Sequence, residues 1–337
     1  MAQRTKKLMN AADDIVREMI EGLCGAAPDH VYMHPDNWRA VIARSGPRPG
    51  KVGILVGGGS GHEPAFVGYV GKGMADAAAI GNVFASPSPD PVEVATRAIS
   101  GGAGVLYLYG NYAGDVMNFD MAADLVGMDG IEVRTVLGID DVASAPPGEI
   151  GRRRGIAGGF FLFKCAGAAA DLGRDLDGVE KAARHAVASM RTMGVALEPC
   201  SLPHTLVPNF TLGADEMEIG LGIHGEPGVQ RGPLRPADAV TDDLVDRIVA
   251  DMPLGRGNRV AVLVNGLGAT SLMELYVMHR RVKQRLDDLG VAIYRSHVGE
   301  YVTSLEMAGA SVTLMQLDGD LQTLLDHPVD ACMYRQA

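Results

Sequence analysis

The sequence lacks the features that mark several common protein classes. Its four cysteines form no Cys-x-x-Cys pair. Because a disulfide framework and a cysteine-based zinc site both need clustered cysteines, we expect reduced thiols and no metal bound to this chain. The basic stretch 1–10 is not followed by the apolar run of a signal peptide, and no segment reaches the length of a membrane span. We therefore expect a cytoplasmic protein with no membrane partner.

The chain also lacks the positive surplus of nucleic-acid-binding proteins. It has 41 acidic residues against 30 lysines and arginines, which gives a net charge of −11. A phosphate backbone is normally met by a basic face. We expect neither DNA nor RNA as a partner.

Two phosphate-binding motifs are absent although the chain contains 44 glycines. The glycine-rich run 57–64 has no lysine and so does not match the Walker motif. The third glycine position of the dinucleotide fingerprint is occupied by His62. Gly71-Lys72 does not match the Walker motif either, because Phe66 stands where that motif needs a glycine. The sequence predicts no nucleotide or other cofactor site in this chain.

What the sequence contains is typical of an α/β enzyme. Hydrophobic residues make up 47% of it, and many glycines follow short apolar runs, as in βα turns. Its length exceeds the size at which one hydrophobic core stops growing, so we expect two domains. A helical pattern ends at Gly194, and we place the domains at residues 1–195 and 196–337. Each is predicted to be a β-sheet flanked by helices.

Apolar spacing predicts the individual elements of both domains. Helices are expected at 11–23, 116–125, 178–193 and 271–289, with another in the alanine-rich stretch after 160–165. Strands are expected at 51–56, 104–109, 131–139, 259–265 and 311–317, and near Thr211 and Leu212.

Two histidines stand in glycine-rich turns. His62 ends a glycine run that follows the strand at 51–56, and His224 lies between Gly222 and Gly225. Asp115 occupies a third loop, after the strand at 104–109, and the loops at the carboxyl ends of such strands usually hold the ligand. One histidine in such a turn is most often structural. Two of them together with an acid favour an active site.

These residue types suit one kind of chemistry. A neutral imidazole nitrogen can attack a carbonyl, a carboxylate can take a proton from a hydroxyl, and a second histidine can hydrogen-bond that hydroxyl. The backbone amide of Gly59 can donate to substrate oxygens where a side chain would obstruct approach. We expect a pocket for small hydroxy-carbonyl compounds. His30 and His34 are four residues apart, but Pro35 argues against a helical metal site there and favours a surface loop.

The sequence resembles the dihydroxyacetone-binding K subunit of the dihydroxyacetone kinase family. The resemblance spans nearly the whole chain and rests on Gly57–Pro64, Gly81–Ser88, Asn111–Phe119, Gly220–Gly228, Asn265–Gly268 and Val298–Met307. It implies two α/β domains, a homodimer, and a short ketose held covalently on His224 as a hemiaminal. It also implies hydrogen bonds from Gly59 and His62 and a general base at Asp115. The remaining expected substrate contacts are Ser60, Gly61 and Gly110.

The same resemblance implies a kinase that is active only with a separate L subunit. Magnesium and ADP or ATP would bind to that subunit, and either ATP or a phosphotransferase-system phosphocarrier would supply the phosphoryl group. Two alternatives stay open. Gly110 and Ala113 stand where relatives commonly have lysine and threonine, which favours a four-carbon ketose such as erythrulose. A ketose-sensing regulatory protein that transfers no phosphate is the second alternative.

Overall fold

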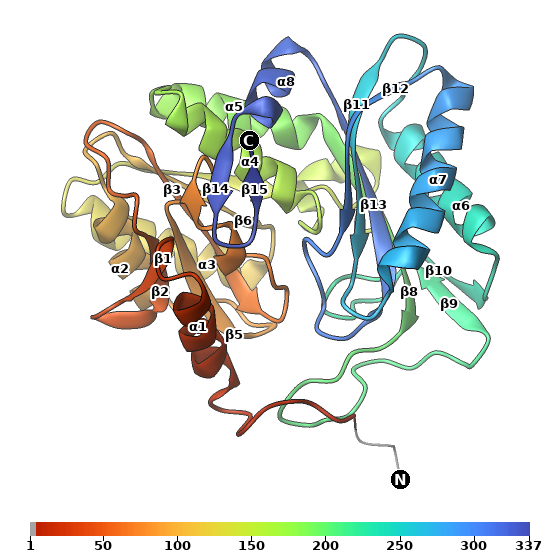
Figure 1. Ribbon diagram of the computed structural model, residues 1–337, viewed down its shortest axis with the longest axis horizontal. Helices are drawn as coiled ribbons and strands as arrows, with labels where there is room; N and C mark the ends of the chain where they lie inside the picture. The colour runs from red at the N-terminus through yellow and green to blue at the C-terminus, as the bar shows by residue number, and fades with distance from the viewer. Residues whose placement is uncertain (1–4) are drawn as a thin grey trace. The chain divides into compact units, whose positions relative to one another are not determined.

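The computed structural model describes residues 5–337, which separate into two compact units (Figure 1). The first, here the His62 unit, comprises Leu8–Gly138, Phe160–Val187 and Asp320–Ala337. The second, here the His224 unit, comprises Ile139–Gly159 and Ala188–Gly319 together with the described residues before Leu8. Each contains a six-stranded sheet with helices packed on it, so the predicted α/β class with two sheet-and-helix units is confirmed. No helix among residues 5–337 is long and apolar enough to cross a membrane.

The sheet of the His62 unit has the strand order β1-β2-β5-β3-β6-β7. Strands β5, β3, β6 and β7 run parallel, while β2 pairs antiparallel with β5 and β1 with β2. The bounds are β1 (Val31–His34), β2 (Asn37–Ala43), β3 (Gly53–Ser60), β5 (Ala77–Val83), β6 (Val105–Gly110) and β7 (Val133–Gly138). The helices of this part of the chain are α1 (Ile15–Ala26), α2 (Pro89–Ile99), α3 (Ala113–Gly127), α4 (Gly159–Asp171), α5 (Leu176–Ala188) and α8 (Gly319–Asp326).

The core of the His62 unit follows from alternation along β6. Tyr107 and Tyr109 point to the face on which α2 and α3 pack, where Phe119 of α3 meets both rings. Elsewhere in the unit, α4 is buried along its length except at its two ends, which explains its almost purely apolar sequence. A small sheet of β4 (Gly71–Lys72), β14 (Val329–Ala331) and β15 (Arg335–Gln336) completes the unit.

The sheet of the His224 unit has the order β10-β9-β8-β13-β11-β12, in which only β11 and β12 are parallel neighbours. Helices α6 and α7 lie side by side over one of its faces and bury an apolar core there (Figure 1). The strands are β8 (Met190–Glu198), β9 (Glu216–Ile219), β10 (Gln230–Pro233), β11 (Arg259–Gly266), β12 (Ala292–Gly299) and β13 (Ala308–Gln316). The helices are α6 (Ala237–Asp251) and α7 (Leu272–Leu289).

The division into units differs from the single boundary predicted after residue 195. Val195 lies inside β8, where it pairs with Ala310 of β13. The segment Ile139–Gly159 comes from the first half of the sequence and belongs to the His224 unit. Its Arg153 is fully buried and donates to the carboxylate of Asp251 at 2.6 and 2.8 Å. An ion pair between residues so far apart in the sequence cannot be predicted from local sequence patterns.

Three element predictions need correction. The helix predicted at 178–193 ends at Ala188, because Met190 and Met193 extend its apolar spacing into strand β8. Thr211 and Leu212 are not in a strand. The glycine run after residue 56 is extended backbone that continues β3 as far as Ser60, instead of a flexible loop. By contrast, the helix predicted at 271–289 is confirmed as α7, with a capping box at Ser271 and a left-handed Gly290 at its end.

Candidate active site

Six of the seven predicted site residues lie at one edge of the His62 unit sheet. Strands β3 and β6 are parallel neighbours, so their carboxyl ends meet at the same edge. The residues are Gly59, Ser60, Gly61 and His62 at the end of β3, and Gly110 and Asp115 at and beyond the end of β6. The seventh residue, His224, belongs to the other unit and has a setting of its own.

The glycines of β3 allow the backbone to pack closely on its neighbours. A Cβ atom at Gly59 would lie 2.7 Å from the backbone nitrogen of Ala85, and one at Gly58 would lie 2.4 Å from the Phe66 ring. The buried Ser60 hydroxyl donates to the carbonyl of Gly81 at 2.9 Å. The end of β3 is therefore fixed against the segment Gly81–Ser88, which comprises the end of its parallel neighbour β5 and the residues after it.

His62 is a buried residue held by aromatic rings. Its imidazole stacks on Phe84 with a centroid distance of 5.0 Å and contacts the edge of Phe66 at 6.5 Å. The backbone N–H of Gly61 donates to the Glu63 carboxylate at 3.0 Å. Burial raises the pKa of Glu63, an effect that backbone hydrogen bonds partly offset. The turn after β3 thus presents the ring in one orientation.

Asp115 lies half-buried in the first turn of α3, where the helix dipole favours a negative charge. Asn118, one turn further, donates to the carbonyl of Pro87 at 2.8 Å and to the Ser86 hydroxyl at 3.2 Å. The same segment, Gly81–Ser88, therefore contacts both the β3 turn and α3. Sequence reasoning gave Asn118 no role of its own.

Gly110 and Tyr109, the two residues before Asn111, have different surroundings. Tyr109 is buried with its ring stacked on Phe119 at 4.2 Å, and burial raises the pKa of its phenol. Gly110 ends β6 and is only half-buried. Of the two, only Gly110 is placed to affect the space at the sheet edge.

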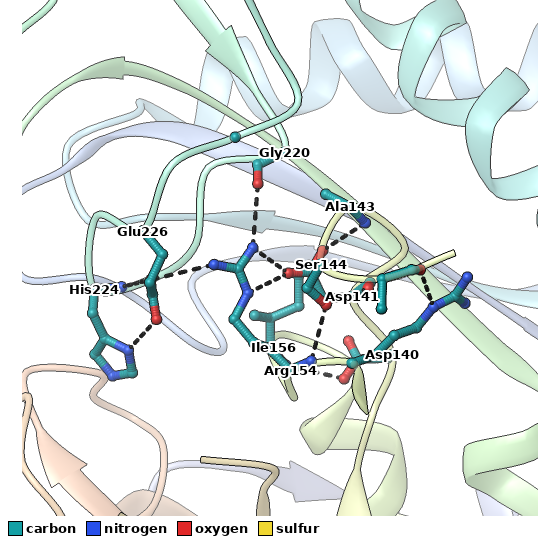
Figure 2. A network of polar contacts seen from close by, with 12 residues as sticks. Asp140, Asp141, Ala143, Ser144, Arg154, Ile156, Gly220, His224 and Glu226 are labelled. Atoms are coloured by element: carbon teal, nitrogen blue, oxygen red, sulfur yellow. Dashed lines mark hydrogen bonds and ion pairs between the residues drawn. The ribbon is translucent and has the colours of Figure 1, made fainter. Parts of the chain in front are cut away.

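His224 lies in the loop between β9 and β10, hydrogen-bonded to Glu226. Its ring Nδ1 is 2.9 Å from one carboxylate oxygen of Glu226, and its backbone N–H donates to the other at 2.9 Å (Figure 2). An ionised carboxylate can only accept, so Nδ1 carries a proton, and in the neutral ring Nε2 carries the lone pair. The imidazole is about one quarter exposed, at 24%. In its neutral form the ring thus has Nε2 as its nucleophilic nitrogen.

Two further side chains hold this loop. The Ser304 hydroxyl donates to the carbonyl of Ile223, and the Asn209 amide donates to the carbonyl of His224 at 3.0 Å. The Ser304 backbone N–H is itself bonded to Leu267 at 2.9 Å. Ser304 lies in one of the segments that carry the family resemblance, which was the available signal for it. Nothing local in the sequence marks Asn209.

The glycines beside His224 make room for charged groups as well as for a ligand. A Cβ atom at Gly222 would lie 2.2 Å from Oε2 of Glu226 and 2.6 Å from a guanidinium nitrogen of Arg154. Burial alone would raise the pKa of Glu226. The hydrogen bond and charge of His224, aided by the Arg154 guanidinium, outweigh burial and lower that pKa to about 2. Glu226 is therefore ionised at neutral pH.

No group of three His, Cys, Asp or Glu side chains that could hold a metal occurs among residues 5–337. His34 lies in strand β1 instead of the predicted surface loop, and His30 contacts Asp330 at 3.0 Å. The four cysteines are unpaired thiols.

Comparison with known proteins gives consistent matches over nearly the whole chain. A model of the Dak1 domain matches residues 21–333. The dihydroxyacetone-binding subunit DhaK of PTS-dependent dihydroxyacetone kinase 2 from Listeria innocua is 46% identical over 330 residues, covering 98% of this chain and 99% of that protein. A D-erythrulose kinase of Mycolicibacterium smegmatis is 45% identical, covering 98% of this chain and 56% of that protein. The structure of the dihydroxyacetone kinase from C. freundii with AMP-PNP and Mg²⁺ superposes with a TM-score of 0.90 at 33% identity, covering 98% of this chain and 61% of that one.

Proposed function

The chain belongs to the Dak1 family, and from that membership we propose that it is the substrate-binding subunit of a dihydroxyacetone (glycerone) kinase. It holds a short ketose on His224 in the cytoplasm while a partner subunit phosphorylates the terminal hydroxyl. The observation that carries the proposal is the 2.9 Å contact between Nδ1 of His224 and Glu226, because it leaves Nε2 as a nucleophile.

Capture of the ketose is an addition without a leaving group. The Nε2 lone pair of His224 forms a bond to the carbonyl carbon, and the π electrons of the C=O bond move to the oxygen. The oxygen takes up a proton, and the ring gives up its Nδ1 proton on the side of Glu226, so one proton is transferred in all. A polyol such as glycerol has no carbonyl and is not captured.

For the remaining roles we propose residues of the His62 unit, as the family resemblance implies. Asp115 accepts the proton of the terminal hydroxyl as that oxygen attacks the phosphoryl group. His62 hydrogen-bonds the substrate, and the backbone at Gly59, Ser60, Gly61 and Gly110 lines the space in which it lies. The fixed ring of His62 and the first-turn position of Asp115 support these roles.

The phosphoryl donor belongs to a partner of the L type. Magnesium and ADP or ATP bind to that subunit, and where ADP stays bound, a phosphotransferase-system phosphocarrier restores its phosphate. The name of the Listeria innocua relative, a PTS-dependent kinase subunit, favours bound ADP that a phosphocarrier rephosphorylates. We propose a homodimer for the chain itself.

Helix α3 offers the L-type partner a docking surface next to Asp115. Four apolar side chains are exposed at helical spacing along α3 and at its end. They are Met117, Met121, Leu125 and Met128, with 61%, 50%, 36% and 80% exposure. A stripe of flexible, exposed methionines is typical of a binding surface. Asp120 and Asp124 are exposed on the same helix, so the partner should offer an apolar patch with lysine or arginine at its margin.

A charge placed in this stripe tests the docking surface. We expect Met121→Glu to weaken L-subunit binding by at least about tenfold, as loss of a central apolar contact does, without changing ketose capture. Titration calorimetry measures binding, and Met273→Glu, at a methionine of α7 that is 79% exposed, is the control. Unchanged binding of the L subunit contradicts the assignment. A dimer that dissociates instead would assign the stripe to the homodimer interface.

Carbon NMR with carbonyl-labelled dihydroxyacetone tests covalent capture directly. The ketone resonance should move into the hemiaminal region with the wild-type chain and with His204→Ala, an exposed histidine of the same unit. It should not move with His224→Ala. An unshifted resonance with the wild-type chain would sink the proposal.

The transfer step is tested with an L subunit present. Asp115→Asn should retain the hemiaminal signal and lose turnover by a factor on the order of 10² or more, because the hydroxyl then has no base. Normal turnover of this variant would contradict the role of Asp115. Capture by the wild-type chain without any turnover would instead favour the ketose-sensing role.

A four-carbon ketose is the second candidate substrate. Gly110 has no side chain and Ala113, at the start of α3, has a small one, where relatives commonly have lysine and threonine, which leaves room for an additional CHOH group. The 45% identical relative named as a D-erythrulose kinase agrees with this candidate. Unlabelled erythrulose that displaces labelled dihydroxyacetone at low concentration supports it. Ala113→Thr should then weaken erythrulose capture more than triose capture.

A further inference from the structure

Arg154 connects the His224 loop to a buried carboxylate. Its guanidinium contacts Oδ2 of Asp141 at 2.8 and 2.9 Å on one side and lies 3.8 Å from Oε2 of Glu226 on the other (Figure 2). A third, weaker contact of 3.5 Å reaches the carbonyl of Gly220. All of these residues belong to the His224 unit. A chain of contacts therefore runs from Asp141 through Arg154 and Glu226 to the ring of His224.

Burial increases along this chain away from the histidine. The exposed fraction of the side chain falls from 30% for Glu226 to 16% for Arg154 and 2% for Asp141. Asp141 is also fixed by the backbone N–H of Ala143 at 3.0 Å. The guanidinium thus has one rigid anchor and one partly exposed partner, and its planar fork can orient that partner.

We propose that Arg154, anchored by Asp141, is a positioning residue that holds the Glu226 carboxylate where it fixes the tautomer of His224. The consequence for ketose capture by Nε2 rests on the proposed function. The effect on the tautomer of His224 does not. The carboxylate must face Nδ1 for Nε2 to keep its lone pair. A carboxylate free to rotate away would let the ring exchange its proton between the two nitrogens.

Two observations support this role independently of the contact distances. The absence of a Cβ atom at Gly222 is what permits the carboxylate and the guanidinium to meet, since that atom would lie within 2.6 Å of both groups. The second is electrostatic. Burial raises the pKa of Asp141 to about 6, with Arg154 opposing the rise and Asp140 adding to it. The Arg154 guanidinium thus favours the ionised form of Asp141.

The arginine run offers a matched set of variants. Arg154→Gln removes the charge, Arg154→Lys keeps the charge without the fork, and Asp141→Asn removes the anchor. Arg152→Gln is the control, because Arg152 is 78% exposed and pairs with the nearby Glu149. Two quantities are measured for each variant. They are the His224 tautomer, from proton–nitrogen NMR of the ligand-free protein, and the rate of hemiaminal formation with labelled dihydroxyacetone.

We expect wild type and Arg152→Gln to show His224 protonated at Nδ1. Arg154→Gln and Asp141→Asn should show a mixture of tautomers and capture the ketose more slowly, on the order of tenfold, as when an outer residue that orients a functional histidine is lost. Arg154→Lys should lie between them and wild type. A purely structural arginine would change stability and leave the tautomer as it is.

The outcomes distinguish the positioning role of Arg154 from the proposed function of the chain. If every folded Arg154 variant keeps the wild-type tautomer and capture rate, the positioning role is overturned. Should Arg154→Gln fail to fold, Arg154→Lys gives the same comparison with the charge kept. If the wild-type chain captures no ketose, the proposed function fails, while the tautomer of the ligand-free protein still decides the role of Arg154.

Discussion

Glu226 receives two hydrogen bonds from one residue, the ring and the backbone N–H of His224. This double contact explains why its pKa falls although the side chain is partly buried. The carboxylate of Glu226 thus connects the fold of the loop to the charge state of its histidine. Its ionisation should contribute to the free energy of unfolding.

The sign of that contribution follows from the two pKa values. The pKa of Glu226 is about 2 in the folded protein against an ordinary value of 4.5. The stabilisation is therefore complete above about pH 4.5 and is lost as the pH falls towards 2. Its upper limit is about 3 kcal/mol, reduced because 30% of the side chain is exposed.

We expect the stability difference between wild type and Glu226→Gln to shrink as the pH falls from about 5 to about 3, because only the wild type loses the ionised carboxylate. Urea unfolding at a series of pH values measures it. For the control Glu149→Gln, at an exposed glutamate, the free energy of unfolding should change with pH as it does in the wild type. A difference that stays constant over this range would show that Glu226 does not have the lowered pKa.

Candidate reactive groups could be predicted from the sequence, whereas the groups that hold them could not. His62, Asp115 and His224 were selected because they follow strands or stand among glycines. Arg154, Asn209 and Ser304 hold the His224 loop from positions remote in the sequence, and no local pattern connects them to it. Such partners become visible only when the chain is folded.

At the scale of elements, the segment Ile139–Gly159 is bound to helix α6 through the carboxylate of Asp251. Asp251, at the end of α6, accepts hydrogen bonds from Arg153 and Arg191, and these guanidiniums lower its pKa. The three side chains are between 0% and 10% exposed. Two buried cations therefore share the carboxylate of Asp251.

Asp251→Asn should lower the free energy of unfolding by about 3–5 kcal/mol, because it removes the carboxylate charge that two buried guanidiniums share. Urea unfolding at neutral pH measures the loss. Asp246→Asn is the matched control on the same helix, since Asp246 is 59% exposed and its ion pair with Arg285 should contribute at most about 1 kcal/mol. Equal losses for the two variants would contradict the role of the buried cluster.

Long elements with clear periodicity were predictable, and their junctions were not. α7 has apolar residues on one face, a capping box and a terminal glycine, and it was predicted within one residue. The boundary between α5 and β8 could not be predicted, because methionines occur in helices and in strands. Pairing with β13 makes the segment after α5 a strand. The glycine run of β3 was taken for a loop, since its strand conformation depends on pairing with β5.

At the scale of the whole molecule, the chain passes between the two units repeatedly, after Lys7, Gly138, Gly159, Val187 and Gly319. A cut at residue 195 therefore divides both units. Fragment 1–195 retains six of the nine residues of β8 without its partner β13, and it lacks β14 and β15.

We expect fragments 1–195 and 196–337, expressed separately, to show no cooperative unfolding, because each leaves apolar surface of an incomplete sheet exposed. Circular dichroism during urea titration measures this, with the intact chain as control. A sigmoidal transition for fragment 1–195 alone would restore the sequence-based boundary.

The small sheet of β4, β14 and β15 has a consequence for synthesis. Gly71 and Lys72 of β4 pair with Ala331 and Asp330, only a few residues from the C-terminus. During translation, β4 leaves the ribosome long before its pairing partner has been made. The nascent chain must avoid aggregation with this edge open until β14 has been made and can pair with β4.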